Sequence, residues 1–172
     1  MKSLKIGDKV IYPNQGLGVV EAIHEEAYNG ERFTVFNLRI ISNNTLVTLP
    51  SSEAAEMGIR RPMTEESIRK LFQFIGDGAV DVTSDWKGRY KEHLNLMKSG
   101  TLFDMATVLK SLYYLSLQKP LSFREKKMME KARELIISEI SEAVASPAAK
   151  IEEKLQAALS RSFKNGKTRC AA

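Results

Sequence analysis

The chain has 172 residues, of which 43% are hydrophobic, and it carries a net charge of +5. This mixture of apolar and charged residues is typical of a folded protein and excludes an intrinsically disordered chain. No apolar run reaches the roughly 20 residues of a membrane-spanning helix, and the first ten residues lack the apolar core of a signal peptide. The single cysteine, Cys170, excludes an internal disulfide, so we expect a cytoplasmic protein with no membrane partner.

The net positive charge of the chain comes from its second part. Residues 1–63 contain seven basic and seven acidic residues, whereas residues 64–172 contain nineteen and fourteen. This asymmetry indicates an acidic partner for the second part. The indication is weakened by the C-terminal segment 161–172, which has no acid, is expected to fray, and supplies four of these cations: Arg161, Lys164, Lys167 and Arg169.

The first fifty residues predict a small β-structure. Short apolar stretches, "DKVIYP", "LGVVEAI", "FTVFNLRI" and "TLVTLP", are separated by turn-forming segments. The Asn29-Gly30 pair predicts a tight hairpin, because both residues accept positive φ. Four or five short strands joined by such turns are expected to curl into a small barrel, which removes most free strand edges.

From Thr64 the apolar period becomes helical. "TEESIRKLFQFI" has Thr64 as its predicted N-cap, and Ser122 is the predicted N-cap of a later helix with Glu125 at the capping-box position. Other helices are expected over about 85–98, 102–118 and 148–162. The sequence therefore predicts an α+β protein with two domains. These are a β-barrel over residues 1–63 and an all-helical bundle over 64–163, followed by a disordered tail over 164–172.

No group of residues is typical of an enzyme. His24 and His93 have no metal-ligand spacing with each other or with Cys170. Glu25 and Glu26 lie beside the predicted hairpin turn, where a solvated charge pair is favoured over an acid–base pair. "GLGVVE" lies between strands, and no phosphate-binding loop follows a strand, so we expect no cofactor. An enzyme remains a rival hypothesis that predicts a concave pocket with convergent polar groups and shifted pKa values.

The only tryptophan, Trp86, lies among cations in "SDWKGRYKEH". Trp86, Tyr90, Leu94 and Met97 recur at helical spacing, which favours a core position for the indole. The alternative is a ring that projects beyond the bundle, because Trp86 falls in the first turn of its helix. An exposed indole among cations suits nucleic acid, since cations bind phosphates and a ring can wedge beside a base.

Four longer stretches are informative in combination: "GDKVIYPNQGLGVVEAI", "LVTLPSSEAAEMGIR", "W..RYKEHLNLMKSG" and "LSFREKKMMEKARELI". In this order, within residues 4–140, they resemble the CarD/CdnL family of bacterial RNA-polymerase-binding transcription factors. The resemblance implies a Tudor/SH3-like barrel that binds the polymerase β subunit. It also implies a helical domain that contacts promoter DNA at the upstream edge of the melted region and stabilises the open complex. We expect a monomer that acts at the nucleoid through polymerase.

The resemblance also implies roles for individual residues. Trp86 is implied to enter the distorted minor groove, beside phosphate contacts from Arg89, Lys91 and Lys126. Polymerase contacts are implied on the strands at Thr48, Leu46 and Glu26.

Two departures from the family pattern affect these roles. Relatives often carry two successive arginines after the tryptophan, where this chain has Gly88 and Arg89. Some relatives have arginine at the positions of Glu26 and Thr48, so this polymerase interface must use other pairings. A protein–protein adaptor with Trp86 in the core remains the alternative function.

Overall fold

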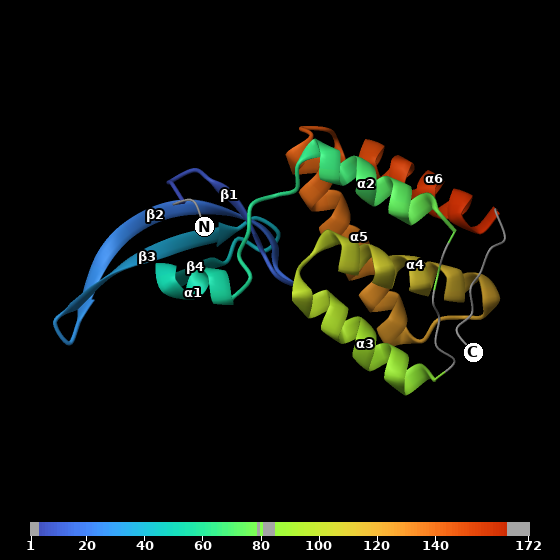
Figure 1. The fold of residues 1–172 in the computed structure, drawn as a ribbon, viewed down its shortest axis with the longest axis horizontal. Helices are drawn as coiled ribbons and strands as arrows, with labels where there is room; N and C mark the ends of the chain where they lie inside the picture. Colours follow the sequence, from blue (N-terminus) through green and yellow to red (C-terminus); the bar gives the residue numbers. More distant parts are fainter. Residues whose placement is uncertain (1–3, 79, 81–84, 165–172) are drawn as a thin grey trace. The chain divides into compact units, whose positions relative to one another are not determined.

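The computed structural model describes residues 4–78, 80 and 85–164, with Trp86 and Lys164 described for their backbone alone. It divides into two compact units, Met1–Pro62 and Met63–Ala172 (Figure 1). The expected boundary followed residue 63. Of the expected tail, Lys164 belongs to the last helix, and residues 165–172 lie outside the described part.

The first unit is a four-stranded antiparallel sheet in the order β1-β2-β3-β4. The strands are β1 (Lys9–Tyr12), β2 (Gly16–Tyr28), β3 (Glu31–Ile40) and β4 (Leu46–Pro50), followed by the short helix α1 (Ser51–Glu56). Helix α1 was not predicted from the sequence, because this helix is short and its N-cap, a proline, makes no side-chain capping bond.

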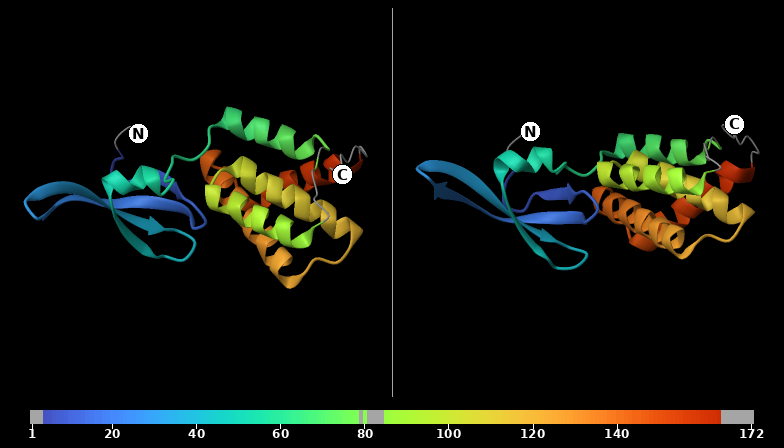
Figure 2. Two further views of the ribbon diagram at one scale, coloured as in Figure 1. Left: turned by 60° about the horizontal axis from the view of Figure 1, so that its bottom comes forward. Right: turned by 90° about the horizontal axis from the view of Figure 1, so that it is seen from below.

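The hairpin between β2 and β3 confirms the predicted turn. Asn29 and Gly30 have φ of 50° and 82°, and Tyr28 pairs with Glu31 across the turn. Both strands are longer than expected, because the polar residues before and after the turn continue the ladder. The turn therefore ends a long ribbon that extends past both neighbouring strands (Figures 1 and 2).

One face of this sheet carries the apolar core of the first unit, which α1 covers through the buried Ala54. The other core residues are Leu4, Val10, Val20, Phe36, Leu38, Leu49 and Ile59. The sheet is a half-barrel of the Tudor-like type, which confirms the predicted fold class. It stays open, because β1 and β4 do not pair in the described residues. The outer edge of β1 is bridged, with Ile11 and Arg60 exchanging hydrogen bonds of 2.7 and 3.2 Å.

The second unit is helical, as predicted. Its helices are α2 (Glu65–Gly76), α3 (Trp86–Ser99), α4 (Leu102–Gln118), α5 (Phe123–Ala143) and α6 (Ala148–Lys164). Two predicted caps are confirmed. The Thr64 hydroxyl accepts from the Ser67 amide at 3.4 Å, and Ser122 and Glu125 form a complete capping box. One apolar core joins all five helices, and its fully buried members include Leu71, Ile75, Leu109, Leu112, Ile136, Ile140, Leu155 and Leu159.

The face that α3 turns inward differs in part from the expected one, although Met97 is buried and Tyr90 packs against the core as expected. Its buried residues are Arg89, His93 and Met97, whereas Leu94, which belonged to the predicted apolar stripe, is 37% exposed. The stripe was wrong at this position because two polar side chains occupy the interior, where Glu125 of α5 compensates the charge of Arg89.

Candidate functional site

Three of the four residues expected to contact DNA have described side chains. Lys91 on α3 and Lys126 on α5 are exposed, and Arg89 is buried. The helix α3 begins at Trp86, as expected, with Asp85 as its N-cap. The Trp86 side chain lies outside the described residues, so its contact with DNA stays a prediction.

Arg89 does not lie on the surface as the expected phosphate contact. Its side chain is 3% exposed, and its Nη2 donates to Oε1 of Glu125 at 3.2 Å. A buried guanidinium needs such a partner, because desolvation of an isolated charge costs several kcal/mol. The ion pair joins the first turn of α3 to the first turn of α5, so Arg89 positions these two helix ends.

Glu125 takes part in the cap of α5 as well as in this ion pair. Its Oε2 accepts from the backbone amide and the hydroxyl of Ser122 at 2.9 and 2.8 Å, and the Ser122 hydroxyl accepts from the Glu125 amide at 3.3 Å. Burial acts to raise the pKa of Glu125, but the hydrogen bonds from Ser122 and Arg89 outweigh it and lower that pKa. The carboxylate is therefore ionised at neutral pH and holds both helix ends.

His93 lies one turn further along the same face of α3. Burial, together with the charge of Arg89, lowers its pKa to about 4, and the opposing effect of Glu125 is smaller. The imidazole is therefore neutral at physiological pH. Although His93 lies in the cationic segment of the sequence, it adds no charge for binding phosphate.

Exposed residues near the starts of α3 and α5, which the ion pair between Arg89 and Glu125 brings together, form a surface that we call the α3–α5 corner. Phe123, the first residue of α5, is 71% exposed, and Nζ of Lys127 lies 4.7 Å from its ring centroid. The remaining members are Lys87, Lys91, Arg124 and Lys126. Cations and an exposed aromatic ring are the groups that bind phosphates and unstacked bases.

The cations Arg124, Lys126 and Lys127 were expected near the start of α3, but Phe123 was not predicted as part of this surface. A usable signal was present, since Phe123 follows the N-cap Ser122 directly and falls outside the apolar stripe that begins at Met128. An aromatic residue in the first turn of a helix and off its buried face is expected to point to solvent.

Two of the expected polymerase contacts lie on the edge strand β4. Leu46 and Thr48 are exposed, and the Thr48 hydroxyl donates to Oδ1 of Asn37 at 3.0 Å. In the part of the chain that the structure describes, no strand pairs with the outer edge of β4. An open edge of this kind can accept a strand from another protein.

Glu26 does not join this group. Thr48 pairs with Asn37, and Asn37 with Ala22, so Glu26 lies two strands away and four residues further along β2. Its carboxylate lies 3.1 Å from Nε2 of His24.

The cation beside Leu46 and Thr48 is Arg39, which the sequence analysis did not single out. Arg39 lies opposite Leu46 in the ladder between β3 and β4. Its Nε and Nη2 each donate to the Glu21 carboxylate at 2.9 Å. The hydrogen bond from Arg39 lowers the pKa of Glu21.

Among the described residues, no cluster of three His, Cys, Asp or Glu could hold a metal ion. None of the helices in the described ranges is long and apolar enough to cross a membrane.

Each of the two units matches a known protein family. Residues 4–63 match the family described as CarD-like/TRCF RID domain, and residues 70–156 match CarD, C-terminal domain. A relative in Bacillus subtilis (strain 168), putative transcription factor YdeB, is 32% identical over 137 residues, covering 79% of this chain and 89% of the relative. The chain belongs to the CarD family. This confirms the resemblance found in the sequence and makes the chain a CarD-like transcription regulator.

A solved structure was also found for part of a family member. The 72-residue N-terminal domain of Myxococcus xanthus CarD, determined by solution NMR, is 32% identical. The match covers 34% of this chain and 79% of that domain, with a TM-score of 0.30.

Proposed function

We propose that this CarD-like regulator binds the RNA polymerase β subunit with its sheet and stabilises the promoter open complex with its helical unit. The DNA contacts lie at the upstream edge of the melted region and involve Trp86, Lys91 and Lys126. Arg89 is omitted from the contact set, because its guanidinium is buried against Glu125. The observation that carries the proposal is the α3–α5 corner, where exposed cations lie near the start of the helix that carries Trp86.

The expected energetics favour one state of the promoter over another. Wedging a ring beside a base step costs a few kcal/mol of unstacking. This cost is smallest where the duplex is already opening, so the protein binds the open complex better than the closed one and shifts the equilibrium toward it. No base needs to be read, because phosphate contacts from Lys91 and Lys126 carry no sequence information.

The sheet supplies the tether in this proposal. The free edge of β4 allows strand addition by the β subunit, and Leu46 and Thr48 lie on that strand. A helical unit that contacts few phosphates binds DNA weakly alone. Tethering to polymerase raises its effective concentration at the promoter and offsets this weakness.

The decisive test is the lifetime of open complexes formed by purified polymerase on one promoter, with and without the protein. The Trp86→Ala variant is expected to return the lifetime close to its value without the protein, and Lys126→Ala to shorten it partially. Lys98→Ala is the matched control, because Lys98 is an exposed cation in the last turn of the same helix. A folded Trp86→Ala protein that prolongs the open complex fully contradicts the proposal.

A further inference from the structure

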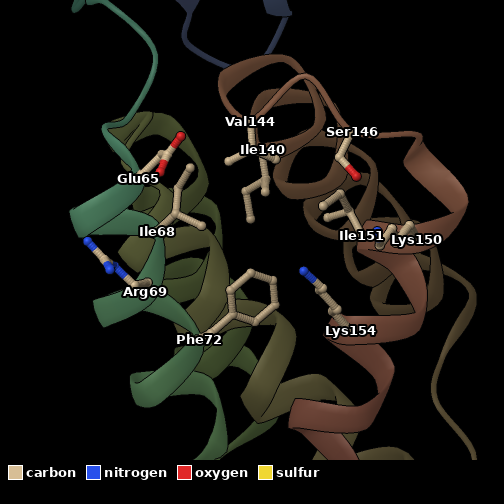
Figure 3. Close-up of a pocket in the computed structure, with 10 residues that line it drawn as sticks. All are labelled: Glu65, Ile68, Arg69, Phe72, Ile140, Val144, Ser146, Lys150, Ile151 and Lys154. Carbon is tan, nitrogen blue, oxygen red and sulfur yellow. The ribbon is translucent and has the colours of Figure 1, made fainter.

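The helical unit contains a hollow that the proposed function does not use. It has a volume of about 350 Å³ and lies between α2, the end of α5 and the start of α6 (Figure 3). Its floor is apolar, formed by Ile68, Phe72, Ile140, Val144 and Ile151. An engineered cavity of about 150 Å³ holds a benzene ring, so this hollow has room for a pair of apolar side chains.

The rim of the hollow is cationic. Arg69, Lys150 and Lys154 line it, and Glu65 is the single acid among its described lining residues. Figure 3 shows Lys154 reaching in from α6 toward Phe72, while Arg69 points outward from α2.

These three cations are not neutralised by acids in the described part of the chain. No ion pair joins Arg69, Lys150 or Lys154 to an acid there. Two acids that are close in sequence pair elsewhere. Glu66 lies 2.7 Å from Lys70, and Glu152 lies 3.5 Å from Arg133. The positive rim is thus available to an external anion.

The shape of the hollow favours a peptide over a small molecule. Small ligands are usually enclosed over most of their surface, whereas this hollow is partly open to solvent. Helices α2 and α6 pack against each other along their lengths, with Gly76 near the Ala158 carbonyl, so the opening follows a helix–helix groove. Such grooves accept an amphipathic helix through apolar anchors spaced at i and i+4.

We propose that the hollow between α2, α5 and α6 binds a helical segment of a partner protein in which two apolar anchors are flanked by acidic residues. The anchors fill the apolar floor, and the acids meet Arg69, Lys150 and Lys154. The chain's own C-terminal residues do not fit this description, because residues 165–172 contain Lys167 and Arg169 and no acid.

The test uses the full chain and two labelled synthetic peptides, without polymerase or DNA. The first peptide is a helix of about 14 residues with leucines at i and i+4 and flanking glutamates. In the second, serines replace the leucines at equal charge. We expect fluorescence anisotropy to show micromolar binding of the first peptide and binding of the second that is weaker by about tenfold.

Charge reversal locates the binding site. Lys154→Glu and Lys150→Glu are each expected to weaken binding of the first peptide about tenfold, since a like charge then faces its glutamates. Lys98→Glu, which reverses an exposed cation elsewhere, is the matched control and is expected to leave affinity within about twofold. All three positions are exposed, so these variants are expected to fold, and thermal melting checks this.

Four results overturn the proposal. One is the absence of binding at about 1 mM peptide. Another is an equal loss of affinity in Lys98→Glu and Lys154→Glu, which shows non-specific attraction. The third is equal affinity for the leucine and serine peptides. The fourth is displacement of the peptide by duplex DNA, which assigns the rim to nucleic acid. The DNA role of Trp86 is tested separately, so either proposal can fail alone.

Discussion

At the scale of single residues, three polar side chains define how the helix ends meet, and Arg89 is the buried one among them. Arg89, Glu125 and Ser122 form one hydrogen-bonded group, and His93 lies beside it. The group fixes the first turns of α3 and α5 through side chains other than the exposed lysines of the α3–α5 corner. A cation in a segment that is expected to bind DNA can thus be structural, and Arg89 is the example here.

His93 makes stability depend on pH. Its pKa is about 4 in the folded chain and near 6.5 when unfolded. The unfolded state therefore takes up a proton first as the pH falls. The stabilisation by neutral His93 is complete above pH 6.5 and is lost between pH 6.5 and 4. We expect a loss of about 2–3 kcal/mol between about pH 7.5 and pH 4.5 in urea unfolding.

His93→Gln is the control for this effect, because carboxylates also titrate over the same range. Stability of the variant should fall less between the two pH values, by the amount assigned to His93. Identical pH profiles for parent and variant would show that the imidazole titrates normally.

The ion pair between Arg89 and Glu125 predicts an asymmetry between two substitutions. Glu125→Ala leaves a buried guanidinium without its carboxylate and removes a capping box, so it is expected to cost about 3–5 kcal/mol. Arg89→Met replaces the buried cation with an apolar side chain of similar length, and Glu125 keeps its bonds to Ser122. We expect a cost of about 1 kcal/mol or less from Arg89→Met, measured by urea unfolding.

The same Arg89→Met variant tests the corrected role of this residue. If Arg89 contacts no phosphate, DNA affinity and its dependence on salt should match those of the parent. A salt slope lower by about one unit would restore the phosphate contact that the sequence had suggested.

At the scale of elements, the caps and the tight turn were predictable because their signals are local. Ser122 and Glu125 lie three residues apart, and Asn29-Gly30 contains its own conformational preference. The buried face of α3 was not predictable from periodicity, because Arg89 is compensated by a residue 36 positions away. Closure of the barrel was also beyond local signals, since turns do not determine whether the first and last strands pair.

Helix α3 begins with a close contact at Gly88, the position where the family resemblance led us to expect an arginine. Asp85 accepts from the Lys87 and Gly88 amides at 3.1 and 2.9 Å, and a Cβ at Gly88 would lie 2.7 Å from Oδ2 of Asp85. Gly88→Ala gains about 1 kcal/mol of helix propensity but displaces this cap, which is worth a similar amount. We expect thermal melting to show a net change near zero.

A second variant separates the gain in helix propensity from the loss of the Asp85 cap. Asp85→Ala with Gly88→Ala has no cap left to displace, so alanine at position 88 should stabilise that background by about 1 kcal/mol. If alanine stabilises both backgrounds equally, the close contact with Asp85 has no energetic consequence.

At the scale of the molecule, two compact units carry two sets of candidate contacts, with Thr48 and Leu46 in one and Trp86 and Lys126 in the other. Each unit has its own apolar core, so a surface substitution in one is expected to leave the other folded. Because the two sets of contacts are separate, one titration of open-complex lifetime against protein concentration can distinguish a defect in the proposed polymerase contact from a defect in the proposed DNA contact.

A weakened contact between the sheet and polymerase lowers the fraction of polymerase that has the protein bound, and excess protein restores that fraction. Loss of the Trp86 wedge instead lowers the increase in open-complex lifetime that each bound molecule produces. Thr48→Arg alters the tether and is therefore expected to shift the midpoint of the titration of open-complex lifetime with an unchanged plateau. Trp86→Ala is expected to lower the plateau with an unchanged midpoint, because polymerase binding by the sheet survives. If Trp86→Ala instead reaches the full plateau at high concentration, the indole contributes to affinity alone and stabilises closed and open complexes alike.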